Sequence, residues 1–357
     1  MRRGLGGGLT RGGRAVAVVL AALMLTGLAA GCSDDAPSGS GEPSANGKDR
    51  PAYASPLLEE LAHVETSTDV RGVEYGDLAA QRAASGGGRP GEALERLTGI
   101  GWSQMARYDR QLREQLGLDS ATADRALQVE GDVPSSGRLV GADLDTGKVA
   151  ARAEKLGARR DGEIAGLDAW RLAPDGRVDP EGLATGLSPA FNVLALGEGT
   201  LVRGAGSAAV RALSADGGKG TLAADPAYAG VATCLGTPLA AVMTGSPRGA
   251  ADRSGTPFVL GAGVTGTDAA HLGQVACRDT SSARAADALA AAVRDRLAGS
   301  APSGDSAPWR ELLPGAKVEV VGGDAHTVRI TGTSAGGPVL LIESVSRGDL
   351  QVLFANP

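Results

Sequence analysis

The chain has 357 residues, of which 42% are hydrophobic and only 3% aromatic, so its core must be built mostly from alanine, valine and leucine. This length is enough for one large domain or for two ordinary ones. The net charge of −6 disfavours binding to nucleic acids or to an anionic membrane surface, because both need clustered lysine and arginine.

The beginning of the chain has the pattern of an export signal. Four arginines lie between positions 2 and 14, and residues 15–28 are then apolar apart from Thr26 and Gly27 and carry no charge. A run of this length suits the hydrophobic region of a signal peptide, and it is shorter than the roughly 20 residues that cross a bilayer. We therefore predict a signal peptide at residues 1–31.

A cysteine follows this segment directly. Residues 28–32 read Leu-Ala-Ala-Gly-Cys, which resembles a bacterial lipobox, although Ala29 stands where that motif most often has leucine. The resemblance implies cleavage before Cys32 and diacylation of its thiol, and two acyl chains make a stable membrane anchor. The alternative is a plain signal peptide that is cut at an Ala-x-Ala-like site, with Cys32 incidental.

The other two cysteines, Cys234 and Cys277, form an even pair in an exported chain. We predict a disulfide between them, because exported compartments are oxidising. Such a bond is worth ~4 kcal/mol on the chain-entropy account. Two buried free thiols or a metal-binding pair are the alternatives, and the metal pair is disfavoured since no second Cys or His lies at ligand spacing from either residue.

The segment after the lipobox is predicted to be a flexible stalk. Residues 32–51 are rich in Ser, Gly, Pro and Asp, and such a composition cannot bury a core. Order is expected from about residue 52. There Ser55 as N-cap, with Pro56 at the first helical position, predicts a short helix.

Strand and helix patterns then alternate. Residues 70–75 have the alternation of a strand, and residues 94–116 have helical spacing of apolar side chains. Asp119 or Ser120 is expected to cap a further helix, which would carry Ala126 and Leu127.

The rest of the chain has the pattern of hairpins and helices. Hairpins are predicted over residues 191–203 and 317–331, each across a turn that contains glycine. Thr280 or Ser281 is expected to cap a long alanine-rich helix that ends at residue 297. Residues 339–345 fit either a helix or a strand.

Together these patterns predict an α+β fold with mixed or antiparallel sheets and packed helices. The order of elements suggests two related halves. The predicted divisions are a signal peptide at 1–31, a stalk at 32–51, a helical N-terminal region at 52–136, a first α+β half at 137–236 and a second at 237–357.

One glycine-rich motif suggests dinucleotide binding. Residues 261–266 read Gly-Ala-Gly-Val-Thr-Gly behind a short apolar stretch, and Asp279 lies near where a ribose-binding acid would follow. The apolar stretch is only about three residues long, and Gly273 would shorten the helix that such a site needs. We therefore predict a turn between two strands and no cofactor.

No catalytic or metal-binding set is predicted. His63, His271 and His326 are the only histidines, none at ligand spacing from another, and each is expected at the surface or at a strand edge. Asp143 and Asp145 lack the further oxygen ligands of a calcium loop, and Asp145 or the residue after it is expected to cap a helix.

The lipobox, the stalk and an ectodomain with a disulfide together resemble the uncharacterised lipoproteins of actinobacteria. We predict an extracytoplasmic protein that is held at the cell membrane by its lipid and is not an enzyme. It would bind a small or lipidic ligand, or an envelope partner protein, and no nucleic acid. The alternatives are an exported hydrolase whose site is assembled from distant Asp, Glu or Ser residues, and a regulatory lipoprotein of a sensor system.

Overall fold

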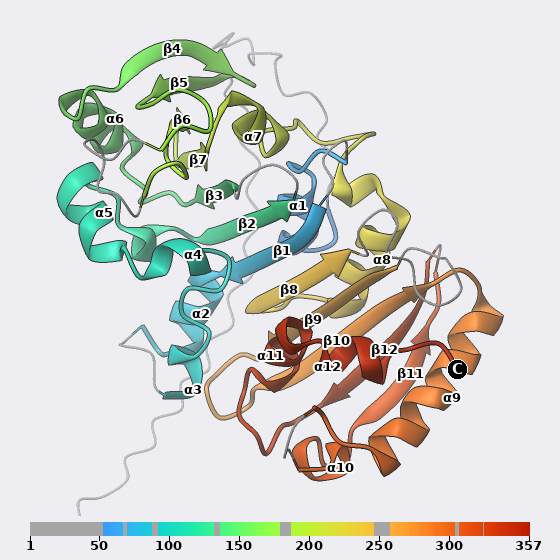
Figure 1. Ribbon diagram of the computed structural model, residues 1–357. Helices are drawn as coiled ribbons and strands as arrows, with labels where there is room; N and C mark the ends of the chain where they lie inside the picture. The colour runs from blue at the N-terminus through green and yellow to red at the C-terminus, as the bar shows by residue number, and fades with distance from the viewer. Residues whose placement is uncertain are drawn as a thin grey trace, which may run out of the picture. The chain divides into compact units, whose positions relative to one another are not determined.

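A computed structural model describes most of the chain from residue 53 on (Figure 1). The predicted signal peptide, the lipidation site Cys32 and the predicted stalk at 32–51 lie outside the described residues. The described residues are 53–66, 70–87, 92–131, 136–178, 187–245, 258–303, 307–323 and 325–357.

The strands form one antiparallel sheet, which confirms the predicted α+β class. Among the described residues the sheet has 12 strands in the spatial order β11-β12-β10-β9-β8-β1-β2-β3-β7-β6-β5-β4. The strands are β1 (Val70–Asp77), β2 (Arg125–Gly131), β3 (Ser136–Val140), β4 (Arg159–Ile164), β5 (Leu167–Arg171), β6 (Val193–Gly197), β7 (Thr200–Gly204), β8 (Ala240–Gly245), β9 (Val259–Thr265), β10 (Gly273–Thr280), β11 (Lys317–Val321) and β12 (His326–Gly332).

The sheet consists of two half-sheets that meet where β1 pairs with β8. The first half-sheet, β1 to β7, and the second, β8 to β12, each begin with three consecutive antiparallel strands. In each, the chain then passes through a helix and returns, so that the last strand pairs with the third. A true repeat stays a prediction. The segment predicted as a helical N-terminal region also supplies β1 and β2, at the centre of the sheet.

Helices cover both faces of the sheet. They are α1 (Pro56–Leu61), α2 (Leu78–Ala84), α3 (Glu92–Glu95), α4 (Ser103–Ala106), α5 (Asp109–Leu116), α6 (Thr146–Lys155), α7 (Ser207–Ala212), α8 (Pro226–Leu235), α9 (Ala283–Gly299), α10 (Trp309–Leu312), α11 (Leu340–Arg347) and α12 (Asp349–Leu353), with short 3-10 turns at Ser120–Thr122 and Leu222–Ala224. None of the helices that the structure describes combines the length and the apolar character needed to span a bilayer.

The two faces have different cores. On one face, here called the α8 face, side chains of α1, α7 and α8 pack with strands of both half-sheets into one continuous core. On the opposite face, here called the α9 face, two separate cores form. One lies under α4 to α6 and the other under α9 to α12. Only the α8 face therefore joins the two half-sheets through a shared apolar core.

The helix caps follow the sequence closely. Ser55 caps α1 by accepting a hydrogen bond from the backbone N–H of Leu58 at 3.3 Å, and Pro56 is the first helical residue. Asp145 caps α6 in the same way, through the N–H of Lys148 at 2.8 Å. Residues 339–345, for which helix and strand were both open, belong mostly to α11.

The helix predicted after Asp119 is wrong. Asp119 caps only a 3-10 turn, and Ala126 and Leu127 lie on β2. Ala126 belongs to a core on the α9 face and Leu127 to the core on the α8 face, so both sides of this strand are buried. A strand that is covered on both sides loses the alternation of apolar and polar residues by which strands are recognised.

The turn predicted at residues 261–266 is also wrong. Gly261 and Gly263 lie inside β9, and the chain turns only after Thr265. A Cβ on Gly261 would lie 2.7 Å from Cγ1 of Val231 on α8, so glycine lets this helix approach the sheet closely. Gly261 thus serves helix packing on an antiparallel strand, which is not the setting of a dinucleotide loop.

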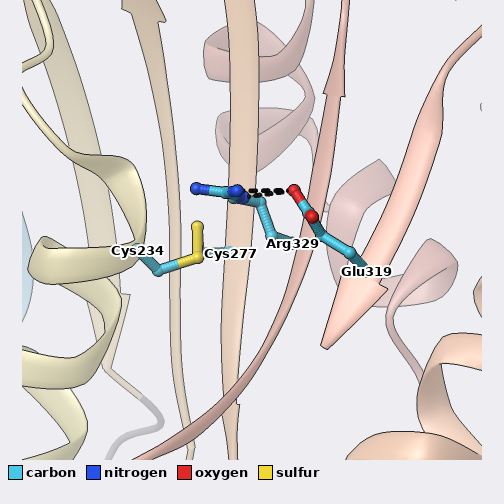
Figure 2. Close-up of a disulfide and its surroundings, with 4 residues drawn as sticks. All are labelled: Cys234, Cys277, Glu319 and Arg329. Atoms are coloured by element: carbon cyan, nitrogen blue, oxygen red, sulfur yellow. Dashed lines mark hydrogen bonds and ion pairs between the residues drawn. A yellow bond between two sulfur atoms is a disulfide. The ribbon is translucent and has the colours of Figure 1, made fainter. Parts of the chain in front are cut away.

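A disulfide fastens the same helix to the sheet. Cys234 of α8 and Cys277 of β10 are joined with an S–S distance of 2.08 Å and a Cα–Cα distance of 6.2 Å, which confirms the predicted pairing. Both residues are buried. Figure 2 shows the bond between helix and strand, beside an ion pair between Arg329 and Glu319.

Candidate functional site

The histidines do not assemble into a site. His63 is buried, contrary to its prediction as a surface or strand-edge residue, and its Nδ1 lies 2.7 Å from the carbonyl oxygen of Ala215. His271 is exposed and pairs with Asp268 at 2.9 Å, a partner that the sequence analysis missed. His326 is the first residue of β12. Within the described residues no cluster of His, Cys, Asp and Glu could hold a metal ion.

Four polar side chains do come together, and we call them the polar relay: Glu74, Ser103, Gln128 and Arg203. Arg203 Nη2 donates to Gln128 Oε1 at 3.3 Å, Gln128 Nε2 donates to Ser103 Oγ at 3.4 Å, and Ser103 Oγ donates to Glu74 Oε1 at 2.8 Å. All donors point the same way, from the cation to the carboxylate. Such alignment lets each hydrogen bond polarise the next.

The sheet register creates this relay. Glu74 of β1 faces Gln128 of β2, which faces Gly137 of β3, which in turn faces Arg203 of β7. Paired residues in a sheet point to the same side, so the side chains of Glu74, Gln128 and Arg203 form one row on the α9 face. Ser103, at the start of α4, lies over that row and completes the chain of hydrogen bonds.

The cationic end of the relay is deeply buried. Arg203 is fully buried, and its guanidinium carbon lies 4.8 Å from the ring centre of Trp102 and 5.4 Å from that of Phe191. Burial lowers the pKa of Arg203 to about 9. A Cβ on Gly137 would come within 3.0 Å of the Trp102 ring and 3.1 Å of Arg203 Nε, so glycine makes the room for both side chains.

The acidic end of the relay reaches a second carboxylate. Burial raises the pKa of Glu74, and the charge of Glu130 adds to that rise, while hydrogen bonds from Ser103 oppose it. Gln104 Nε2 donates to Glu130 Oε1 at 2.8 Å. Because Ser103 and Gln104 open α4, the two carboxylates hold the start of this helix against the sheet.

A second buried ionic group lies on the α8 face. Glu60 of α1 is 2% exposed, and its carboxylate lies 3.1 Å from Nε of Arg138 and 3.5 Å from Nε of Arg125. Arg125 also pairs with Glu59 at 2.6 Å. These ion pairs attach α1 to β2 and β3. A buried ion pair fixes geometry more than it adds stability, so we assign this group a structural role.

Two hollows flank the edge strand β11, and we call β11 with these hollows the edge site. One, of about 380 Å³, lies between α8 and the turn after β11 and includes Gly230, Thr233 and Val321 in its lining. The other, of about 340 Å³, lies between α9, α10 and β11 and is lined in part by Arg294 and Arg310. Both linings otherwise consist mainly of small or apolar residues.

Comparisons of this chain with models of protein families, with curated proteins and with solved structures find no match. The functional reading therefore depends on the residues themselves.

Neither the polar relay nor the edge site was predicted from the sequence. Arg203 did carry a signal, because it interrupts an apolar strand between Val202 and Gly204 in a predicted hairpin. Arg294 and Arg310 carried none, since each lies on a helix surface where arginine is ordinary. Only the fold brings both of them to the lining of one hollow.

We predict that Arg203 stabilises the protein mainly by packing. Arg203→Ala should lower the free energy of unfolding by about 3 kcal/mol, because it leaves a cavity beside Trp102. Arg203→Met keeps most of the volume and should cost less than half as much. Urea unfolding of both variants checks this, and equal losses would show that the charge and its hydrogen bonds dominate.

We also predict a pH-dependent effect of Glu74. Because the pKa of Glu74 is raised above 4.5 in the folded state, its contribution to stability is full below that pH and is lost as the pH rises through the raised pKa. Glu74→Gln cannot ionise, so its stability relative to the wild type should increase with pH over this window. Glu130→Gln, which removes the neighbouring charge, should weaken the wild-type pH dependence. A constant difference between Glu74→Gln and wild type from about pH 4 to about pH 7 would contradict this.

Proposed function

We propose that this chain is an exported lipoprotein, anchored to the membrane through a diacylated Cys32, whose folded part is a binding module. The observation that carries the proposal is the disulfide between Cys234 and Cys277. It uses the two cysteines that the lipobox leaves over, and it is the pairing that an oxidising compartment favours.

A binding role fits the chemistry of the described residues better than catalysis does. The clustered polar groups serve the fold: the polar relay holds α4, and the Glu60 group holds α1. The edge site, in contrast, leaves two hollows and two arginines at the surface. Such a surface suits an envelope partner protein or a small amphiphilic ligand.

The hydrolase alternative has one set of residues in its favour. Glu74, Glu130 and Ser103 lie close together, as a site assembled from distant residues requires. Glu74 accepts a hydrogen bond from the Ser103 hydroxyl, as a base would, but the same contact and the one from Gln128 hold the start of α4. A structural role therefore accounts for these contacts without a reaction. A regulatory role in a sensor system is one form of partner binding and falls within the main proposal.

Intact mass spectrometry of the protein extracted from membranes tests the proposed export and lipidation. We expect a mass that corresponds to cleavage before Cys32 plus a diacylglyceryl group, and a gain of two hydrogens on reduction. The matched control is Cys32→Ser, which should remain unprocessed by this route and lack the lipid.

An unmodified N-terminus, or free thiols at Cys234 and Cys277 before reduction, would overturn the lipoprotein proposal. A non-covalent mass that persists in the native spectrum would instead identify a small ligand directly. Turnover of peptide, ester or glycan substrates by the purified chain, lost in Ser103→Ala, would favour the hydrolase.

A further inference from the structure

We propose that the edge strand β11 receives an extended, acidic segment of a partner protein as an additional strand of the sheet. This inference rests on the proposed binding function and names its mode and the chemistry of the partner. Main-chain hydrogen bonds to an open sheet edge provide affinity in such complexes, and pockets for alternate side chains provide specificity.

The two ends of the sheet differ in a way that favours β11. At the other end, β4 has five exposed residues of six, an irregular register between Arg160 and Glu163, and an exposed ion pair between Arg160 and Asp168. Bulges and charges of this kind protect a sheet edge from pairing. β11 instead pairs with β12 over five positions without a shift and has three valines.

The backbone of β11 presents a group for pairing. The carbonyl oxygen of Val318 accepts a hydrogen bond from Nη2 of Arg294 at 3.0 Å. We infer that this carbonyl points away from β12, and since directions alternate along a strand, the backbone of Val320 points outward as well. Arg294 then covers an open position of the edge, and an added strand would replace it with a backbone N–H.

The two hollows lie on opposite faces of this edge. Val318 lines the hollow beneath α9, and Val321 lines the hollow beside α8. Successive side chains of an added strand also point to opposite faces. A bound segment would therefore place alternate side chains in the two hollows, with small or apolar residues toward α8.

The positive charge of Arg294 and Arg310 favours an acidic side chain of the added strand in the hollow beneath α9. Within the described part of the chain Arg294 makes no ion pair, and the ion pair of Arg310 with Glu311 is a loose one of 3.9 Å. Arg310 also donates a hydrogen bond to the carbonyl oxygen of Ala298 at 3.1 Å. On the other face Glu319 is already neutralised by Arg329, at 2.5 Å (Figure 2). On the α9 face the unmatched charge at the edge is thus positive. It fits an aspartate or glutamate of the partner segment.

A matched pair of labelled peptides tests this inference on the full chain purified from membranes. One peptide alternates valine and threonine with glutamate at its centre, and the other has lysine there. We expect the glutamate peptide to bind at least tenfold more tightly by fluorescence anisotropy. It should also slow amide hydrogen exchange at residues 317–321 and leave that of β4 unchanged.

Three variants make the test specific. Val320→Pro removes an outward N–H, which an edge strand tolerates, and should weaken binding at least tenfold, whereas Val320→Thr should not. Arg294→Glu should reverse the preference between the two peptides, and this holds even if the proline variant does not fold.

Equal affinity for both peptides, protection of β4 in place of β11, or no binding at millimolar concentration would overturn the inference. If Cys32 is nevertheless lipidated and the disulfide is intact, that result leaves the proposed membrane anchoring unaffected. An unmodified Cys32 together with peptide binding at β11 would overturn the lipoprotein proposal and support the strand addition.

Discussion

The pairing of β1 with β8 is the constraint on which the rest of the fold depends. Five positions, from Gly72 opposite Thr244 to Gly76 opposite Ala240, connect strands that lie far apart in the sequence. Every other strand attaches to one side or the other of this ladder. Without it the chain would form two separate sheets, each with a long unpaired edge of the kind that promotes aggregation.

The two faces support this junction by different means. On the α8 face, Tyr75 of β1 and Met243 of β8 belong to the same apolar core, which α8 and the disulfide close. On the α9 face the apolar cores are separate, and the polar relay crosses β1, β2, β3 and β7 instead. Apolar burial therefore joins the half-sheets, while directional hydrogen bonds fix the loop and helix that lie over the first of them.

Local chemistry made part of this structure predictable. Ser55 and Asp145 cap the helices that their sequences indicate, and the hairpin over 317–331 forms as β11 and β12, because caps and turns depend on neighbouring residues. The disulfide was predictable for a similar reason, since the predicted compartment and the number of cysteines restricted the choice of partner.

The sequence-based predictions were wrong, or were missing, where contacts between distant parts of the chain determine the structure. β2 is buried on both sides, so its sequence lacks the alternation of apolar and polar residues. Gly261 is needed for close packing against a helix about 30 residues earlier in the chain, and it does not form a turn. Arg203 is buried because Trp102 and Gly137, from other elements, shape its surroundings. The edge site depends on which strand ends the sheet, and strand order cannot be read from local pattern.

Native-state hydrogen exchange of the purified protein tests most directly whether the β1–β8 ladder unites the molecule. The amides of β1 and β8 should exchange only through global unfolding, and the interior strands of both half-sheets should share the same opening free energy. Exchange of β3, β6 and β7 at a distinctly lower free energy, while β9 and β10 stay protected, would show two independent units and contradict this account.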